Sequence, residues 1–522
     1  MKKVIILLSI ICNILIAQEL NYSFGKEFES IKNHDEYGFF KFDDSTFADV
    51  YFHQGEDIIF QIHDKKFNGL IKEETAPLPK GSKYCDNEGF FSVKNEFFWF
   101  YSTWDKKTEK ERLFALPFDK TNFKFSLNPI NLIETGRLSK IYDKYQFNIS
   151  NDSNKLLVTY RVKPKIKNEL LNRDIIGFNL YDSQMKKIFA SEIEMPYSEY
   201  DMDILRYKVD SRGNIYMLMK VKLNNSLDGE RNKEDKNSYR YELARVNQKE
   251  NTLQSIKIEL DNKYTKSVLL TEDLNQDIVI AGYYSDVKNS NSSNGAYIIK
   301  LELESNNYIK KFIKTYYEFP NEVLELSKTT KEKKKMNKKE KANHLEVENL
   351  KLEQVVFNKD GSIIIIGQEH YIMTYSYTDG KIPITLNNYY FNDILILKAD
   401  KNGKGIWCNK IPKYQSGGSN TDLSFHYHQL NDDNYFFYLD NNNNMNKPFT
   451  ESPEIFKSER GGYLTCVKID NAGKMTKKAV LDIKDEYLQI YPLSLKSISE
   501  NIIVSKIDED YKHSKIFKLE TR

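Results

Sequence analysis

The amino-acid sequence predicts an all-β protein built from repeated units, and three observations carry that prediction. Short apolar runs rich in Ile, Val, Tyr and Phe recur along the 522 residues, separated by polar turns that contain Asn, Asp and Gly. No long helical period interrupts these runs. The composition, with 40% hydrophobic, 29% charged and 13% aromatic residues, is that of a folded globular chain and excludes a multi-span membrane protein.

The repeated element is a polar turn followed by an apolar run. Asp210–Gly213 precedes Asn214–Met219 (NIYMLM), and Asn358–Gly361 precedes Ser362–Gln368 (SIIIIGQ). Seven copies of the run begin at intervals of about 60 to 85 residues, at Asn95, Lys155, Asn214, Asp277, Ser362, Asn434 and Asn501. This self-similarity indicates a repeat architecture, in which each unit needs its neighbours to form a core.

A second hairpin follows several of these copies. Ile175–Asp182 continues into Lys187–Ile193, and Ile394–Asp400 continues into Gly405–Ile411. Each unit is therefore expected to hold four short antiparallel strands. The glycines of the turns are expected to have the positive φ that a tight hairpin requires, as at Gly361, Gly403 and Gly473.

Four-stranded units at this spacing are typical of a β-propeller. Its sheets form a ring, and each sheet buries both faces against its neighbours. Burial of both faces also explains the run Ile363–Ile366, which does not alternate with polar residues. We expect about seven four-stranded blades, with six or eight as alternatives.

The end of the chain indicates how the ring closes. The last copy has a first hairpin within Tyr491–Lys506 and a third strand at Lys515–Leu519, but no fourth strand before Arg522. We expect an N-terminal strand to complete this blade, which removes an exposed sheet edge. Gly38–Phe42 and Asp57–His63 are available for it. Alternatively, the N-terminal region forms most of an eighth blade.

One hairpin carries a resemblance to a known group of proteins. The segment Ile394–Ile411 (ILILKADKNGKGIWCNKI) resembles hairpins that recur in the secreted, propeller-like repeat proteins of the Bacteroidetes. The resemblance extends over most of the chain after the first 17 residues. It implies a propeller fold and export, and it implies no particular activity.

Residues 1–17 have the features of a secretory signal peptide. Lys2 and Lys3 precede the apolar stretch Val4–Ile16, which is too short to span a bilayer as a helix, and cleavage is expected after Ala17. The alternative is a buried strand or an uncleaved anchor. We expect residues 18–522 to form a single propeller domain without a transmembrane anchor. The predicted location is the periplasm, the cell surface or the extracellular medium.

Charge and cysteine content limit the partners. The 77 basic and 75 acidic residues nearly balance, and the signal peptide accounts for two of the lysines, so no nucleic-acid partner is predicted. Three cysteines follow it, Cys85, Cys408 and Cys466, without a C-x-x-C pair. Either Cys408 and Cys466 form one disulfide or all three are thiols. No cofactor and no oligomeric state is predicted.

A lysine-rich insertion accounts for the widest interval between copies. Residues 328–341 (KTTKEKKKMNKKEK) have no apolar face, and we expect a disordered insertion at about 328–343. A solvated loop is the favoured interpretation. Contact with an anionic surface or polysaccharide is the alternative.

Few side chains stand out as candidates for a site. Trp99, Tyr101 and Trp104 could stack on sugar rings, although packing between blades is the favoured interpretation. His426 and His428 share one face of a predicted strand and could reach one metal ion, but no motif supplies a third ligand, so no metal site is predicted. No P-loop, dinucleotide fingerprint or nucleophile elbow is present, and catalytic residues cannot be assigned.

These observations favour a secreted or periplasmic binding or scaffold protein that recognises a protein or glycan through its propeller loops. The alternative is an extracellular polysaccharide hydrolase or lyase with residues around the central channel. An enzyme should have a deep polar pocket with titratable groups from three or more blades. A binding module should have a shallow apolar or aromatic patch on one rim.

Overall fold

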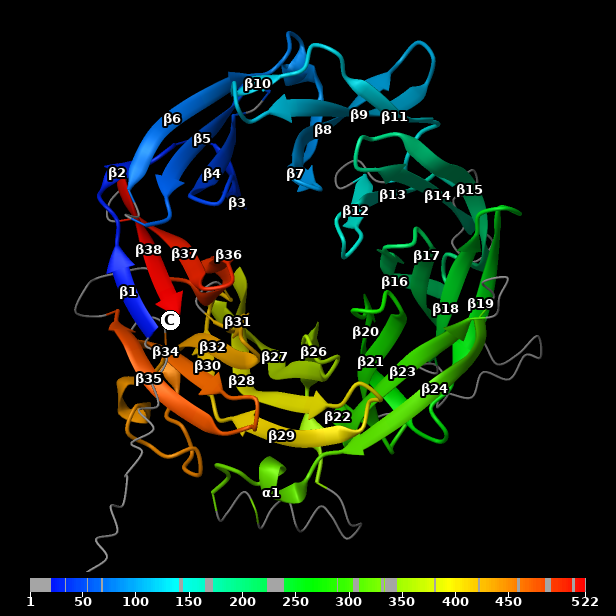
Figure 1. The fold of residues 1–522 in the computed structure, drawn as a ribbon. Coiled ribbons are helices and arrows are strands. Elements are labelled where there is room, and N and C mark those ends of the chain that lie inside the picture. Colours follow the sequence, from blue (N-terminus) through cyan, green and yellow to red (C-terminus); the bar gives the residue numbers. More distant parts are fainter. Residues whose placement is uncertain are drawn as a thin grey trace, which may run out of the picture.

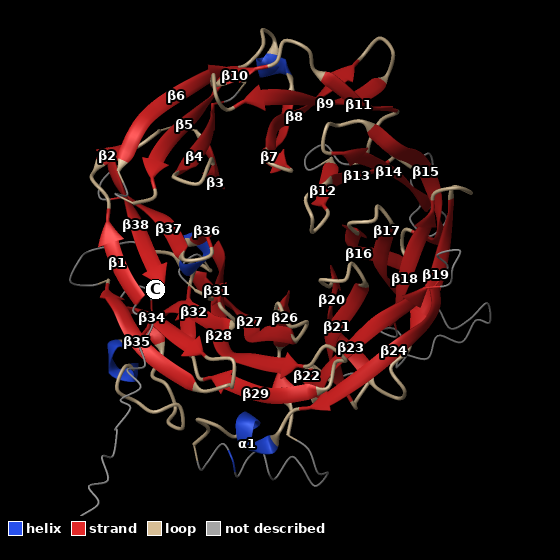
Figure 2. Cartoon of the chain, in the orientation of Figure 1, coloured by secondary structure: helices blue, strands red, loops and turns tan. Residues whose placement is uncertain are grey.

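The computed structural model describes residues 20–521, apart from 33, 54, 67–68, 140–143, 165–171, 223–238, 289, 304–308, 330–332, 334–344, 380–381, 421–422, 458–460, 484–489 and 509–511. The described residues form eight sheets of four or more strands, which we number blades 1 to 8. The sheets are arranged in a ring, with the first strand of each nearest the centre (Figures 1 and 2).

The first four blades follow one another along the chain, and within each of them consecutive strands are antiparallel neighbours, except that the last two strands of blade 2 both pair with its third. Their strands are, in blade 1, β3 (Asp35–Lys41), β4 (Thr46–His53), β5 (Asp57–Asp64) and β6 (Leu70–Pro77); in blade 2, β7 (Asp86–Val93), β8 (Glu96–Asp105), β9 (Lys110–Asp119), β10 (Lys124–Phe125) and β11 (Ile130–Thr135); in blade 3, β12 (Tyr145–Ile149), β13 (Lys155–Arg161), β14 (Arg173–Asp182) and β15 (Lys187–Ser198); and in blade 4, β16 (Met202–Val209), β17 (Ile215–Lys222), β18 (Tyr239–Asn247) and β19 (Thr252–Ile258).

The other four blades include most of the insertions. Their strands are, in blade 5, β20 (Tyr264–Glu272), β21 (Ile278–Ser285), β23 (Gly295–Leu303) and β24 (Ile309–Glu318); in blade 6, β26 (Leu350–Phe357), β27 (Ile363–Asp379), β28 (Ile382–Ala399), β29 (Gly405–Ile411), β30 (Gln415–Gly417) and β33 (Phe456–Lys457); in blade 7, β31 (His426–Leu430), β32 (Asp433–Asp440), β34 (Tyr463–Ile469) and β35 (Met475–Asp482); and in blade 8, β36 (Lys496–Ser499), β37 (Ile502–Asp508), β38 (His513–Thr521), β1 (Leu20–Phe24) and β2 (Phe28–Glu29). Between blades 5 and 6 lie the short pair β22 (Ser292–Ser293) and β25 (Val347–Glu348), and helix α1 (Asn321–Leu324).

An N-terminal strand completes the last blade, as the sequence predicts. β1 is antiparallel to β38, with Leu20 opposite Thr521 and Phe24 opposite Phe517. The first and last strands of the described chain therefore share one sheet, at the left of Figure 1. Pairing in this blade leaves Leu20 and Phe24 packed against the core between blades 7 and 8.

The number of blades is eight, the upper alternative of the prediction rather than the preferred seven. The seven repeated runs are all second strands, those of blades 2 to 8. Gly38–Phe42 and Asp57–His63 do not close the ring. They contribute to β3 and β5 of blade 1, whose second strand begins at Thr46, about 50 residues before the next second strand.

The core consists of apolar layers between adjacent sheets. Ile364 and Ile366 face blade 7, whereas Ile363 and Ile365 face blade 5, and all four side chains are fully buried. This arrangement confirms why the run does not alternate with polar residues. Complete burial of such a side chain stabilises the fold by about 1.5 to 3 kcal/mol.

The structure contains free thiols rather than a disulfide. Cys408 and Cys466 are buried and Cys85 is half-buried. Cys408 belongs to the apolar layer between blades 5 and 6, and Cys466 to the layer between blades 7 and 8. The two side chains point away from each other across blades 6 and 7, so the disulfide considered for this pair is wrong.

The two ends of the strands define two faces of the ring. On the turn face, tight turns join first to second and third to fourth strands, as at 210–214, 358–362, 400–404 and 470–474. Gly361, Gly403 and Gly473 have the predicted positive φ. The loop face holds the connections from second to third strands and from one blade to the next, which vary in length and include long ones such as 441–455.

Two predicted segments fall largely outside the described residues: Met1–Ala17, and residues 328–343 apart from Lys328, Thr329 and Lys333. The predictions for them stay predictions. Within the described ranges, no helix has both the length and the apolar character needed to cross a membrane.

Candidate functional site

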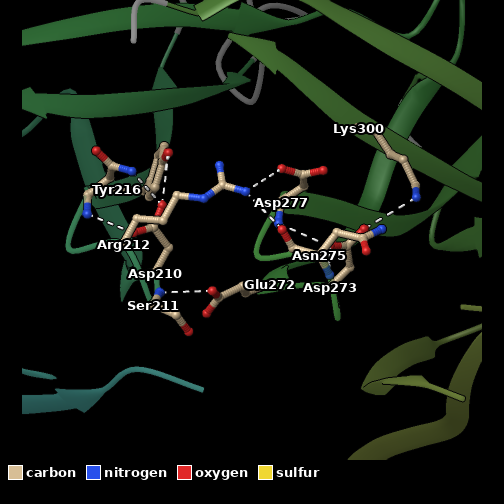
Figure 3. A network of polar contacts seen from close by, with 10 residues as sticks. Asp210, Ser211, Arg212, Tyr216, Glu272, Asp273, Asn275, Asp277 and Lys300 are labelled. Atoms are coloured by element: carbon tan, nitrogen blue, oxygen red, sulfur yellow. Dashed lines mark hydrogen bonds and ion pairs between the residues drawn. The ribbon is translucent and has the colours of Figure 1, made fainter. Parts of the chain in front are cut away.

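The turn face is held by a network of carboxylates that cap the turns (Figure 3). The Asp210 carboxylate, 1% exposed, accepts hydrogen bonds from the Asn214 backbone N–H and from its side-chain amide, each at 2.7 Å. Asp273 likewise accepts from the N–H groups of Asn275 and Asp277, at 2.9 and 3.0 Å. Because these bonds satisfy backbone donors inside the turn, they fix its conformation.

The same network joins neighbouring blades. Arg212 of blade 4 donates to the Asn275 carbonyl at 2.8 Å and pairs with Asp277 of blade 5 at 3.0 Å. Glu272 is 1% exposed, and its Oε1 accepts from the Ser211 N–H at 2.8 Å. Figure 3 shows these side chains meeting between the two turns. These contacts connect the two turns, and of the residues that make them Arg212 and Asp277 remain 44% and 48% exposed.

The loop face has a pocket of about 570 Å³ between blades 3 and 4. In it Arg161 binds the buried Asp174 with two nitrogens, one of them Nε at 2.6 Å, and its Nη2 lies 3.3 Å from Glu199. Tyr200 and Lys222 line the opening. This volume is within the range of small-ligand sites. Arg161 and Asp174 lie on β13 and β14 of blade 3, Glu199 directly follows β15, and Arg161 forms an ion pair with each carboxylate.

A second charged group lies beside this pocket. Lys144, which also lines it, contacts Asp86 and Glu111 at 2.7 Å and the buried Ser102 at 3.2 Å. Burial acts to lower the pKa of Lys144, but the hydrogen bonds to these carboxylates raise it above its usual value. Burial raises the pKa of the neighbouring Glu88 to about 7. Lys144 is therefore held protonated and paired with Asp86 and Glu111.

The channel wall holds a smaller pocket of about 340 Å³, formed by the innermost strands of blades 3 to 6. Its charged residues are Arg206, Lys208 and Glu353. Burial lowers the pKa of Lys208 and raises the pKa of Glu353. This wall can hold a small polar molecule. No histidine lines this pocket.

The most prominent feature of the loop face is a two-stranded arm, residues 371–390 of β27 and β28. Pairing of β26 with β27 ends at Leu350 and Glu369, whereas β27 and β28 remain paired as far as Asp379 and Ile382. Beyond the sheet the ribbon therefore continues for ten residues of β27, which corresponds to ~30 Å. Among the described residues, the arm forms hydrogen-bonded pairs with one further strand, β30, and only where it joins the sheet, at Tyr389–Phe391.

One face of the arm is aromatic and apolar. Cross-strand partners share a face, and on this face Tyr375 lies opposite Leu386 and Tyr377 opposite Ile384. Tyr375, Tyr377 and Leu386 are 50 to 53% exposed. At the base, Tyr371 and Tyr390 stack with ring centroids 4.8 Å apart. The other face is mainly polar, with Thr374, Ser376, Thr385 and Asn387.

The two strands of the arm carry little charge. No charged residue occurs in 371–378 or 384–391, in a chain with 29% charged residues. Edge strands of monomeric proteins are usually protected by charged side chains or proline, and in this arm such residues are confined to Asp379, Lys381 and Pro383. An exposed aromatic face on largely uncharged strands is the kind of surface that protein partners cover.

The aromatic residues singled out from the sequence lie in blade 2. Trp99 is 1% exposed, donates from Nε1 to Asn87 at 2.9 Å, and stacks on Tyr101 with centroids 4.5 Å apart. Tyr101 is half-buried and stacks in turn on Phe114. Trp104 is half-buried and lies 6.0 Å from the Arg137 guanidinium. Their role as ligand-stacking residues stays a prediction.

The predicted histidine pair lies between blades 7 and 8. His428 contacts the Ser497 hydroxyl at 2.8 Å and the Glu500 carbonyl at 2.7 Å, and His426 contacts the same hydroxyl at 3.2 Å. Burial lowers the pKa of both imidazoles, that of His426 to about 4. The described residues bring a different set, His34, His53 and Asp57, within metal-ligand distance of one another.

Sequence reasoning missed the arm, although a signal for it is present. YIMTYSYTD (371–379) alternates large apolar with polar residues, and ITLNNYYF (384–391) follows after a short interval. This is the pattern of a hairpin with one apolar face. The hairpin pattern is hard to separate from the repeat unit, because the adjacent core run Ile363–Gln368 has the stronger β signal.

No protein-family model matches the sequence, and no curated protein matches it. Among solved structures, the chain is similar to a prolyl endopeptidase (9% identity, 96% of this chain and 55% of that one, TM-score 0.39). It is also similar to prolyl oligopeptidase B from Galerina marginata (9%, 93% and 55%, TM-score 0.38). The β-propeller domain of the Trilobed protease from Pyrococcus furiosus is a further match (10%, 86% and 98%, TM-score 0.33). The chain thus spans about 55% of the length of the two peptidases.

Proposed function

We propose that this protein is a binding protein whose ligand is another protein, recognised through the arm of blade 6. The observation that carries the proposal is the aromatic face of the arm, with Tyr375, Tyr377 and Leu386 about half exposed. Tyr and Met are enriched in protein interfaces, and Tyr buries a large, rigid surface at low entropic cost. Met373 lies on the same face as the two tyrosines, opposite Asn388.

The rest of the molecule suits this role as a scaffold. The arm continues two strands whose inner part, Ile363–Gln368 and Ile394–Ala399, is fixed in the core. Its base is therefore rigid, which limits the entropy lost on binding. The turn face, by contrast, uses its polar side chains internally, as Asp210 and Glu272 do.

We also propose that the protein acts outside the cytoplasm, as the signal-like residues Met1–Ala17 and the resemblance to secreted repeat proteins of the Bacteroidetes predict. N-terminal sequencing of the protein recovered from the culture medium and periplasm tests this. Gln18 as the first residue supports export. Recovery from the cytoplasm with Met1 retained contradicts it.

The binding proposal is tested with three forms of the purified protein used as bait for exported proteins of the source cells. They are the wild type, the arm variant Tyr375→Ser/Tyr377→Ser and a control, Thr374→Ser/Ser376→Thr, on the opposite face. We expect a partner that wild type and control retain and the arm variant loses. For the isolated partner, Kd should rise at least ~30-fold in the arm variant, because two interface tyrosines contribute ~2 kcal/mol or more.

Two results would overturn the proposal of a protein ligand. One is equal retention of every partner by wild type and arm variant. The other is binding to uncharged oligosaccharides on a glycan array that the arm variant loses, since this would identify the arm as a glycan platform. Circular dichroism of all three forms establishes that they are folded.

A polysaccharide hydrolase or lyase is the second candidate, and the pocket between blades 3 and 4 favours it. Asp174, Glu199 and Asp203 are the carboxylates there, but the first two are paired with Arg161, which opposes their use as base or nucleophile. Incubation with a panel of polysaccharides tests this alternative. Release of reducing ends that Glu199→Gln abolishes would support it and displace the binding proposal.

A further inference from the structure

We propose that His34, His53 and Asp57 of blade 1 form a binding site for a divalent transition-metal ion of the zinc type. One ligand atom from each residue lies within 4.8 Å of the other two. The three residues belong to adjacent strands at one end of the sheet: His34 immediately precedes β3, His53 ends β4 and Asp57 begins β5.

Backbone pairing explains why the three side chains meet. His53 is directly opposite Asp57 in the β4–β5 pair, and Asp35 is opposite Phe52 in the β3–β4 pair, so His34 lies alongside His53. The two imidazole rings are 4.4 Å apart between centroids. Tight packing fixes the intervening turn, because Gly55 has φ +78° and a Cβ there would lie 2.5 Å from the Lys83 Cα.

The polar atoms are arranged as metal ligands rather than as a satisfied hydrogen-bond network. Asp57 Oδ1 is buried and makes no hydrogen bond to any described residue. It lies 3.4 Å from His53 Nδ1. Bonds of ~2.0 Å at tetrahedral angles separate two ligand atoms by ~3.3 Å, so one ion between them would satisfy both.

The orientation of His34 also fits. Its Nδ1 is hydrogen-bonded to the Lys32 carbonyl, and a carbonyl only accepts, so Nδ1 carries the proton and Nε2 has the free lone pair. A backbone acceptor on the far nitrogen is the usual way to orient a metal-binding imidazole. Sequence analysis missed this set because its members are 19 and 4 residues apart on three strands rather than in one local motif.

The donor set selects the kind of ion. Two imidazoles and one carboxylate suit Zn²⁺, Co²⁺ or Ni²⁺, whereas Ca²⁺ and Mg²⁺ prefer oxygen ligands throughout. All three residues are half-buried, so an ion can enter from solvent and a water molecule can complete the coordination. The exposed Glu56, whose Oε2 lies 3.7 Å from His53 Nδ1, is an alternative fourth ligand.

The position of the site points to a stabilising role. His34 follows directly on the segment that contains β1 and β2, which pair with β38 of the last blade. An ion shared by His34 and the β4–β5 turn would anchor the end of this closing segment to blade 1. Metal that binds only the folded state raises the unfolding temperature.

The test uses full-length protein without a polyhistidine tag, stripped with chelator, loaded with ZnCl₂ and separated from free metal. We expect about one zinc per chain by elemental analysis, and a higher Tm with zinc than with chelator. His53→Ala and the isosteric Asp57→Asn should each weaken zinc binding at least 10-fold in calorimetric titration and abolish the increase in Tm. The control His513→Ala, in a His–Glu pair on β38, should behave as wild type.

Three results would overturn the inference. They are wild-type protein with no more zinc than Asp57→Asn, stoichiometric zinc that survives both substitutions, and zinc lost on His428→Gln instead. The first would identify the cluster as an ion pair between His53 and its carboxylates. Because Asp57→Asn conserves the size of the side chain, loss of zinc in that variant, with an unchanged circular dichroism spectrum, separates ligand loss from misfolding.

Discussion

The turn face and the loop face are built from the same strands but use their polar residues in opposite ways. On the turn face one geometry recurs: an Asp accepts hydrogen bonds from backbone N–H groups two and four residues later, as Asp400 does from Asn402 and Lys404 at 2.9 Å. On the loop face the connections differ from blade to blade, and they carry the pocket and the arm. The turns that repeat from blade to blade therefore belong to the scaffold, and the connections that differ between blades form the surface available for binding.

Carboxyl groups also differ in their electrostatics. On the turn face, hydrogen bonds from Ser362 lower the pKa of Asp360, and those from Thr121 and Asn122 lower the pKa of Asp119. On the loop face, burial raises the pKa of Glu88 and of Asp440, whereas hydrogen bonds lower the pKa of Asp105 to about 2. Hydrogen-bond donors stabilise the charged form in the turns, and desolvation destabilises it at Glu88 and Asp440.

The largest effect on stability is expected from Asp210→Ala on the turn face. The substitution leaves the Asn214 N–H and side-chain amide without their acceptor in a buried turn. We expect a loss of ~2 to 4 kcal/mol in the free energy of unfolding, because unsatisfied buried donors add to the loss of the bonds themselves. Urea unfolding followed by circular dichroism measures it.

Asp400→Ala is the matched control for this substitution. Asp400 accepts two similar backbone hydrogen bonds, but it is only half-buried, so water can replace it. A loss of ~1 kcal/mol is expected. If both variants lose the same unfolding free energy, burial of the Asp210 turn adds nothing to its hydrogen bonds. The network of Figure 3 would then not stabilise the turn face beyond an ordinary exposed turn.

A smaller, pH-dependent effect is expected from Glu88→Gln beside the loop-face pocket. Burial raises the pKa of Glu88 to about 7 in the folded protein, above ~4.3 in the unfolded chain. The folded state therefore binds the proton more tightly, and this stabilisation is full below pH ~4.3 and lost as pH rises through 7. Glutamine stays neutral and can still accept a hydrogen bond from Ser102. The difference in unfolding free energy between Glu88→Gln and wild type should therefore be ~1 to 2 kcal/mol more favourable to the variant at pH 8 than at pH 5.

The control for this prediction is Asp360→Asn on the turn face. Hydrogen bonds from Ser362 lower the pKa of Asp360, so its titration ends below pH 5. Its effect on the unfolding free energy should be the same at pH 5 and pH 8. A Glu88→Gln effect that is equally constant would show that Glu88 is ionised throughout this range.

Much of the scaffold was predictable because its signals are local. The turn Asp210–Gly213 and the run Ile363–Ile366 each occur in a few consecutive residues. Blade 1 was predicted only as an alternative, because its second strand, Thr46–His53 (TFADVYFH), has no Asn or Gly turn of the repeated type before it. Gly38–Phe42 and Asp57–His63 were therefore equally available to close the ring.

The candidate sites were less predictable because they depend on contacts between distant residues. Arg161, Asp174 and Glu199 form the polar pocket from the ends of three strands, and His34, His53 and Asp57 meet only through strand register. Cys408 and Cys466 show the converse. They lie in neighbouring blades, but strand pleating directs them to opposite interfaces.

The smallest effect on stability is expected from the arm variant Tyr375→Ser/Tyr377→Ser. Both side chains are about half exposed, and neither belongs to an apolar layer between blades. The unfolding free energy should change by no more than ~0.5 kcal/mol, as is usual for surface positions. Urea unfolding under the conditions used for Asp210→Ala gives the comparison. A loss of ~2 kcal/mol instead would show that the aromatic face is packed within the protein. The two faces would then differ in geometry alone, since both would use their side chains internally.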